Sequence, residues 1–184
     1  MTSKYILFYK PYGVLCQFTG EEGDRTLSEF NLPKEVYAAG RLDKDSEGLL
    51  LLTNDGPFIK RLTDPKSKKE KTYWVQVEGI PTAADLKKMT TGLRIKDYLT
   101  KPCQARLMKD FSFPERNPPI RERKNIPTSW LEVKLIEGKN RQVRRMCAAI
   151  GFPCLRLIRS GIGKVHLGLL KEGEFKEVKR SEIL

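Results

Sequence analysis

The sequence has little of what a secreted, membrane-spanning or metal-binding chain needs. No apolar run approaches the roughly 20 residues of a membrane-spanning helix. The apolar stretch near the N-terminus ends at Pro11 and is too short for a secretory signal. The four cysteines contain no CxxC pair, and His166 is the only histidine, so a zinc site and a disulfide framework are both disfavoured. We therefore expect a cytoplasmic protein with reduced thiols.

Acidic residues are scarce relative to basic ones. The 184 residues include 35 Lys and Arg against 23 Asp and Glu, which gives a formal net charge of +12. A charge of this size informs about partners rather than about fold, and it favours nucleic acid. An anionic membrane surface is a weaker candidate, because the chain shows no Lys/Arg-rich amphipathic helix of the membrane-surface kind.

Strand and helix signals are mixed without regular alternation. The sequence predicts strands at 5–10, 48–53, 72–78, 130–136 and 155–165, a short helix at 26–29, and helices at 57–63, from 82 onward and at 141–150. Residues 93–129 hold five of the eleven prolines and are expected to be partly an exposed loop. This pattern predicts an α+β fold with a mixed, largely antiparallel sheet.

An acid-rich segment, GRLDKDSEGLLLLTNDG at 40–56, precedes the apolar strand. A calcium loop is disfavoured, because its twelfth position is Asn54 and four leucines stand where such a loop stays wet. A magnesium-dependent nuclease, with Asp43 and Asp45 as two of its carboxylates, and a plain polar turn are both open. A reactive carboxylate is the third interpretation, since an acid on a surface that binds a polyanion repels the ligand unless it has a chemical role.

A basic helix, GKNRQVRRM at 138–146, is the second motif. Arg141, Arg144 and Arg145 lie beside an apolar stripe, and Lys139 stands close to the helix start. Cations are disfavoured at a helix N-terminus, so this cluster suggests an external phosphate or an internal carboxylate partner such as Asp43. A solvated arginine face is the alternative interpretation.

Together these pieces resemble the pseudouridine synthases that modify ribosomal RNA at single uridines, in the branch that joins the small-subunit enzymes of type A with the large-subunit enzymes of types B, E and F. The likeness is carried by YILFYKPYGVL, the acid-rich segment, KTYWVQVEG, and EGKNRQVRRMCAAIGFPCLRLIRSGIG, in that order. RNPPIRERKNIPTSWLEV further resembles the E-type enzyme of large-subunit (23S) ribosomal RNA.

The resemblance implies the pseudouridine synthase fold, with two lobes around a central catalytic cleft, and no cofactor or metal. It also implies a single catalytic domain without the extra N-terminal RNA-binding domain of many relatives. Its lobes would be residues 1–72 plus a returning C-terminus, and 73–170.

The resemblance also implies residue roles. Asp43 corresponds to the nucleophile, Tyr73 to a tyrosine that stacks on the target uracil, and Arg144 to the basic residue that pairs with the aspartate. Leu157 corresponds to an apolar wall beneath the site. Three mechanisms remain open, in which the carboxylate acts at the anomeric carbon, at carbon six of the base, or as a base at the ribose 2′ position.

The expected partner is 23S ribosomal RNA, bound by a monomer with the target uridine flipped out of its stack. The candidate phosphate contacts are Arg41, Lys139, Arg141, Arg145 and Arg159. Asp45 and Glu47 are assigned to loop structure, holding Arg41. Two other classes stay open: a non-catalytic RNA-binding or ribosome-assembly protein, and a metal-dependent nuclease.

Overall fold

The computed structural model describes residues 2–183, and the chain forms two compact units. Unit 1 contains the residues up to Lys69 and those from Arg159 onward, and unit 2 is Glu70–Ile158. The chain therefore leaves unit 1 once and returns to it within strand β11 (Cys154–Ile162). The prediction from the sequence was that the chain passes from the first lobe to the second near residue 72, and that the C-terminal residues return to the first lobe.

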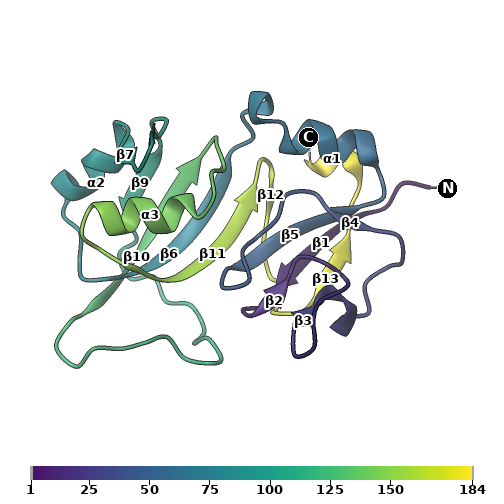
Figure 1. The fold of residues 1–184 in the computed structure, drawn as a ribbon, viewed down its shortest axis with the longest axis horizontal. Coiled ribbons are helices and arrows are strands. Elements are labelled where there is room, and N and C mark those ends of the chain that lie inside the picture. The colour runs from purple at the N-terminus through teal and green to yellow at the C-terminus, as the bar shows by residue number, and fades with distance from the viewer. Residues whose placement is uncertain (1, 184) are drawn as a thin grey trace. The chain divides into compact units, whose positions relative to one another are not determined.

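Unit 1 is built on antiparallel strands. Its elements are β1 (Tyr5–Lys10), β2 (Val14–Leu15), β3 (Arg25–Thr26), η1 (Leu27–Glu29), β4 (Tyr37–Ala38), β5 (Glu47–Thr53), α1 (Gly56–Thr63), η2 (Pro65–Ser67), β12 (Val165–His166), β13 (Phe175–Glu177) and α4 (Arg180–Ile183). The strand order is β13–β1–β5–β11, with β4 on β5 and β12 on β11. Figure 1 shows β13, β1 and β5 side by side. Strand β1 is antiparallel to both β5 and β13, whereas β2 and β3 form a short parallel pair.

The four leucines of β5 are the most deeply buried part of unit 1. Leu49, Leu50, Leu51 and Leu52 are all fully inaccessible, so both faces of this strand are covered, as its unbroken apolar run predicts. Full burial of one leucine side chain contributes roughly 1.5–3 kcal/mol. The strand that follows the acid-rich loop is therefore a rigid support.

Unit 2 is also built on strands, with helices on one face. Its elements are β6 (Lys71–Glu78), α2 (Ala83–Thr90), β7 (Arg94–Ile95), β8 (Tyr98–Leu99), β9 (Gln104–Leu107), β10 (Thr128–Leu135), α3 (Gln142–Ala149) and the first part of β11. The order is β11–β6–β10–β9, and the β6–β10 and β10–β9 pairs are antiparallel. Side chains alternate along β6, so that Tyr73, Val75 and Val77 enter the core with residues of α3. The α+β fold with a mixed, largely antiparallel sheet is confirmed.

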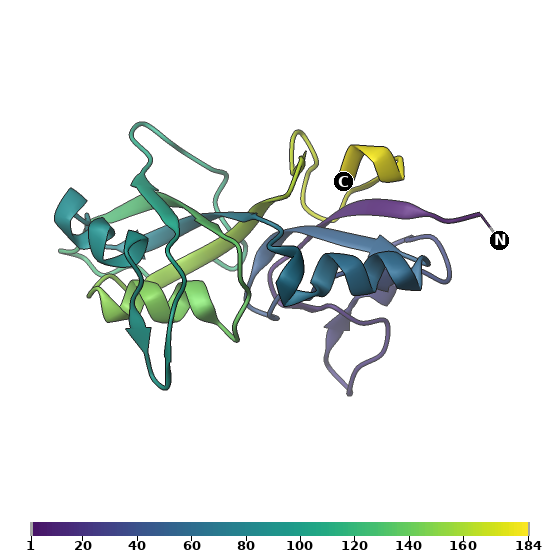
Figure 2. The same ribbon diagram turned by 90° about the horizontal axis from the view of Figure 1, so that it is seen from above.

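An aromatic cluster lies on the other face of the unit 2 strands. Trp74 and Trp130 surround Phe111 and Phe113, with ring centroids 5.1–6.3 Å apart. The Arg156 guanidinium lies 5.2 Å from the Phe113 ring centre and donates a 2.6 Å hydrogen bond to the Pro114 carbonyl. These contacts anchor the long loop between β9 and β10, which lies on the side of the sheet opposite α3 (Figure 2).

One predicted strand is wrong at its C-terminal end. The strand predicted at 155–165 ends at Ile162, because Gly163 has a positive φ of 56° and turns the chain into β12. The exposed loop expected within 93–129 is the segment between β9 and β10. The region also contains three short strands that were not predicted, of which β9 forms the edge of the unit 2 strands. Their sequences lack a long apolar alternation, so pattern alone did not reveal them.

Candidate active site

Asp43 lies in a tight turn directly before the buried strand β5. Its side chain is half-buried, and its carbonyl accepts a 3.0 Å hydrogen bond from the Ser46 amide. Gly40, with φ 93°, begins the segment in a conformation that favours glycine. The Gly13 amide donates to the Lys44 carbonyl at 2.8 Å. Backbone hydrogen bonds thus fix the chain on the C-terminal side of Asp43.

Arg159 holds the same loop from β11. Its Nε donates to the Leu49 carbonyl at 2.8 Å, its Nη2 to the Gly40 carbonyl at 3.2 Å and its Nη1 to the Arg41 carbonyl at 3.4 Å. The residue is only 2% exposed. A guanidinium that is buried in this way is stable only because carbonyl oxygens replace its hydration. This placement favours a role in loop structure over the phosphate contact expected from the sequence.

Lys10 is a second buried cation beside the loop, and it is not among the residues predicted from the sequence. Its Nζ donates to the Pro11 and Val14 carbonyls at 2.7 Å each and to the Lys44 carbonyl at 3.4 Å. The residue is fully inaccessible, and burial lowers its pKa from 10.5 to about 8. Its position in the sequence could have indicated this burial. A single cation at the end of an otherwise apolar strand is buried with the strand and must find buried hydrogen-bond acceptors.

The other acids of the loop lie near this lysine. Glu47 is fully buried at the start of β5, and Asp45 is half-buried. Both carboxylates oppose the lowering of the Lys10 pKa by their negative charge, whereas the Arg159 charge adds to it. The acids that stand out in the sequence therefore balance buried cations. Arg41, which they were expected to hold, is exposed.

Cys16 contacts the residue just before Asp43. Its Sγ accepts a hydrogen bond from the Leu42 amide at 3.2 Å and lies 3.3 Å from the Leu42 carbonyl. Leu42 itself is 8% exposed and anchors the turn in the core of unit 1. Side chains from three different segments thus hold the backbone around Asp43.

In unit 2, Tyr73 and Leu157 share one hydrophobic cluster with α3. Tyr73 on β6 and Leu157 on β11 pack with Val143 and Met146. Arg144 lies on the same helix, is half-buried, and its Nη1 lies 3.7 Å from the Cys154 Sγ. The structure therefore gathers three predicted residues of unit 2 around α3, and two of unit 1, Asp43 and Arg159, around one loop.

The predicted phosphate contacts at the start of α3 are at the surface of unit 2. Lys139 and Arg141 are exposed, and the Arg145 guanidinium donates to the Asn140 side-chain oxygen at 2.8 Å. Arg141 is the N-cap residue, with φ 50°, and no side chain caps the helix. The Gln142 amide of this first turn donates to the Lys139 carbonyl at 3.1 Å, so the feature that would attract an anion here is the group of basic side chains.

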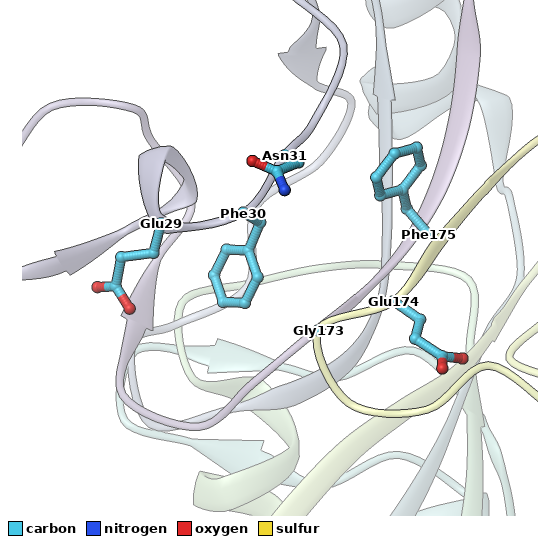
Figure 3. Close-up of a pocket in the computed structure, with 6 residues that line it drawn as sticks. All are labelled: Glu29, Phe30, Asn31, Gly173, Glu174 and Phe175. Atoms are coloured by element: carbon cyan, nitrogen blue, oxygen red, sulfur yellow. The ribbon is translucent and has the colours of Figure 1, made fainter.

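Two pockets lie away from all these residues. One, of about 450 Å³, is lined by Glu29, Phe30, Asn31, Gly173, Glu174 and Phe175 (Figure 3). Another, of about 320 Å³, lies along β9 and β10 and is lined by Gln104, Ala105, Arg106, Glu132 and Lys134. Within residues 2–183 there is no group of three or more His, Cys, Asp or Glu side chains placed to hold a metal ion. No helix in the same range has the length and apolar character to cross a bilayer.

This α+β sheet arrangement is shared with known RNA pseudouridine synthases. The family model described as RNA pseudouridylate synthase matches residues 4–149, and the chain belongs to this family. A solved structure described as a pseudouridylate synthase superposes with a TM-score of 0.82 at 30% identity, covering 99% of this chain and 73% of the other.

Curated relatives narrow the likeness to one type. Ribosomal large subunit pseudouridine synthase E of Vibrio vulnificus (strain CMCP6) is 57% identical over 175 residues, which cover 95% of this chain and 75% of the relative. The enzyme of the same description from Xanthomonas campestris pv. campestris is 52% identical, covering 93% of both chains. The family and the E-type likeness predicted from the sequence motifs are confirmed.

Proposed function

We propose that this protein isomerises one uridine of large-subunit (23S) ribosomal RNA to pseudouridine. The observation that carries the proposal is the 57% identity, over nearly the whole chain, to a ribosomal large subunit pseudouridine synthase E. The net charge of +12 suits an RNA substrate. In the reaction the bond from the ribose carbon C1′ to N1 of the base breaks and a bond from C1′ to carbon five forms. Carbon five loses its hydrogen to solvent as a proton, and N1 takes up a proton.

Asp43 is the proposed nucleophile. Its turn is held by backbone and side-chain hydrogen bonds in front of a fully buried strand, so little reorganisation is needed when a substrate arrives. A half-buried carboxylate also keeps contact with solvent, through which a flipped nucleoside enters.

Tyr73, Arg144 and Leu157 are the proposed partners of Asp43. The Tyr73 ring would stack on the uracil, and its hydroxyl would assist removal of the proton from carbon five. Arg144 would orient the aspartate and stabilise its charge, since a guanidinium can present two donors to one carboxylate. Leu157 would form the apolar floor, a role for which its 5% exposure and its place in the core of unit 2 are suitable.

Four surface cations are the proposed phosphate contacts: Arg41, Lys139, Arg141 and Arg145. Contacts to phosphates on either side of the target offset the few kcal/mol that flipping a base costs. Arg159 is left out because its donors go to the loop backbone. An rRNA substrate places the protein in the cytoplasm, and we propose that it acts as a monomer, which light scattering will check.

The test is release of tritium from large-subunit rRNA transcripts labelled at carbon five of uridine. The wild-type protein should release one tritium per transcript in the presence of EDTA. Asp43→Asn should release none while binding the transcript with an affinity within about threefold of wild type, because the lost charge does not contact phosphate. Asp110→Asn is the matched control, since Asp110 is exposed with φ 53°, a conformation that asparagine tolerates.

Two results would contradict the proposal. An inactive wild-type protein, together with unchanged pseudouridine in rRNA from cells lacking it, would indicate a non-catalytic RNA-binding protein. Strand cleavage that EDTA abolishes would indicate a metal-dependent nuclease.

A further inference from the structure

Arg159 connects the two ends of the loop that carries Asp43. Two of its carbonyl acceptors, at Gly40 and Arg41, lie directly before Leu42 and Asp43, and the third, at Leu49, lies in the strand that follows. One planar group therefore fixes the entry and the exit of the loop at distances of 2.8–3.4 Å. Rotation of the turn relative to β5 would break at least one of these hydrogen bonds.

The geometry of this contact requires arginine. A guanidinium presents its N–H donors in a rigid fork, and here Nε, Nη1 and Nη2 each reach a different carbonyl. A lysine carries its three donors on one nitrogen, as Lys10 does, whereas the three acceptors here are each reached from a different nitrogen of the guanidinium. Because the residue is 2% exposed, water cannot replace the missing donors without entering the core.

The burial of Arg159 also decides between two roles for its charge, namely contact with an RNA phosphate and support of the Asp43 loop. A phosphate contact needs donors that reach the surface, whereas every hydrogen bond that its guanidinium makes to a described backbone oxygen points into the loop. Lys10 supports the other side of the turn through the Lys44 carbonyl at 3.4 Å. The loop is thus held by two cations that lie inside the protein.

We propose that Arg159 is a positioning residue for Asp43, acting through the backbone of residues 40–49 rather than through the RNA. This inference rests on the proposed function, in which Asp43 is the nucleophile. A displacement of about 1 Å at a reacting group can cost about 100-fold in rate. Loss of Arg159 therefore lowers the rate of the chemical step and leaves RNA affinity intact.

Single-turnover kinetics of tritium release from the labelled transcript test this directly. Arg159→Lys should lower the rate constant at saturating enzyme by about 10- to 100-fold, with the Kd for RNA within about twofold of wild type. The slope of log Kd against log salt should match wild type, whereas loss of a phosphate contact lowers it by about 0.7–0.9. Hydrogen exchange of the peptide spanning residues 40–48 should be faster than in wild type, and that of α1 unchanged.

A second variant guards against a fold that does not tolerate lysine. Arg159→Ala should regain part of its activity when low concentrations of guanidinium chloride are added, and sodium chloride at equal ionic strength should not replace it. The matched surface control is Lys176→Gln on β13, which should behave as wild type in all assays.

The possible results separate the inference from the proposed function. Wild-type rates in Arg159→Lys, or weaker binding with a reduced salt slope, would overturn the positioning role while Asp43→Asn remained inactive. Failure of both Arg159 variants to fold at 20 °C would also overturn it, because the residue would then serve global stability. An Asp43→Asn variant with full activity would instead remove the proposed role of Asp43 itself.

Discussion

At the scale of single residues, the Asp43 loop depends on side chains that do not contact solvent. Lys10 and Arg159 are 0% and 2% exposed, and both donate to carbonyl oxygens of the loop or its neighbours. Glu47, also fully buried, supplies negative charge near Lys10. Asp43 could be selected from the sequence because its motif is local. Lys10 was not selected, and Arg159 was selected only as a phosphate contact, because the loop carbonyls that they bind lie 34 and 110–119 residues away along the chain.

The buried Lys10 predicts a specific dependence of stability on pH. Its pKa is lowered by burial from 10.5 to about 8, so between these values the unfolded chain binds more protons than the folded one. The free energy of unfolding therefore rises with pH in this window, and below about pH 8 the cost of burying the charge is constant. Relative to Lys10→Met, wild type should gain up to about 3 kcal/mol between pH 7.5 and 10.5.

Urea denaturation at a series of pH values measures this difference. Lys176→Met, at an exposed position of β13, is the control and should show no such change. A wild-type-minus-variant difference that stays constant across the window would show that Lys10 keeps its ordinary titration in the folded state.

At the scale of secondary-structure elements, local chemistry made the helix starts predictable where a capping side chain exists. Thr82 and Asp85 form a reciprocal capping box at α2, and Thr26 and Glu29 do so at η1, both from spacing visible in the sequence. The start of α3 was not predictable in this way. Its N-cap is Arg141 in a left-handed conformation, and no side-chain cap is present.

The loop between β9 and β10 was predicted only as a proline-rich exposed segment, and its order comes from long-range aromatic contacts. Phe113→Ala removes a ring that packs on Trp74, Trp130 and Arg156. Each such aromatic contact contributes about 0.5–1.5 kcal/mol. If the variant loses about 1.4 kcal/mol of the free energy that keeps the loop closed, the open form of the loop becomes about tenfold more populated.

Trypsin cleavage within the loop, followed by mass spectrometry, measures this opening. The sites after Arg121 and Lys124 are exposed and should be cut about ten times faster in the variant, in proportion to the population of the open form. Phe175→Ala in unit 1 should leave these rates at the wild-type value. Equal cleavage of wild type and Phe113→Ala would mean that the aromatic cluster does not order the loop.

At the scale of the whole molecule, the net charge of +12 does not describe the charge that an RNA meets. Lys10, Arg156 and Arg159 are buried, and they donate hydrogen bonds to backbone carbonyls inside the protein. Arg159 was predicted to contact phosphate because the segment LRLIR at 155–159 gives no sign that both of its arginines are enclosed. Family likeness, in contrast, was readable because its motifs extend over nearly the whole chain.

The proposed RNA contacts predict how strongly binding depends on salt. If Arg41, Lys139, Arg141 and Arg145 each neutralise one phosphate, log K should fall with log salt at a slope of about −3 to −4. Raising salt from 50 to 200 mM then weakens binding by about 100-fold. The double variant Lys139→Gln/Arg141→Gln should reduce the magnitude of this slope by about 1.4–1.8 and weaken binding at low salt, with the rate constant of saturated enzyme unchanged.

The charge-matched control is Lys87→Gln/Lys88→Gln on the exposed side of α2, which removes the same net charge elsewhere in unit 2. Fluorescence anisotropy of a labelled rRNA hairpin, over a series of salt concentrations, gives both slopes. Long-range attraction, which salt screens, depends on the total charge of the protein, whereas the number of phosphates bound depends on where the cations lie. Only the Lys139→Gln/Arg141→Gln variant should therefore change the slope. Equal slopes for the two double variants would show that the start of α3 does not contact the RNA backbone.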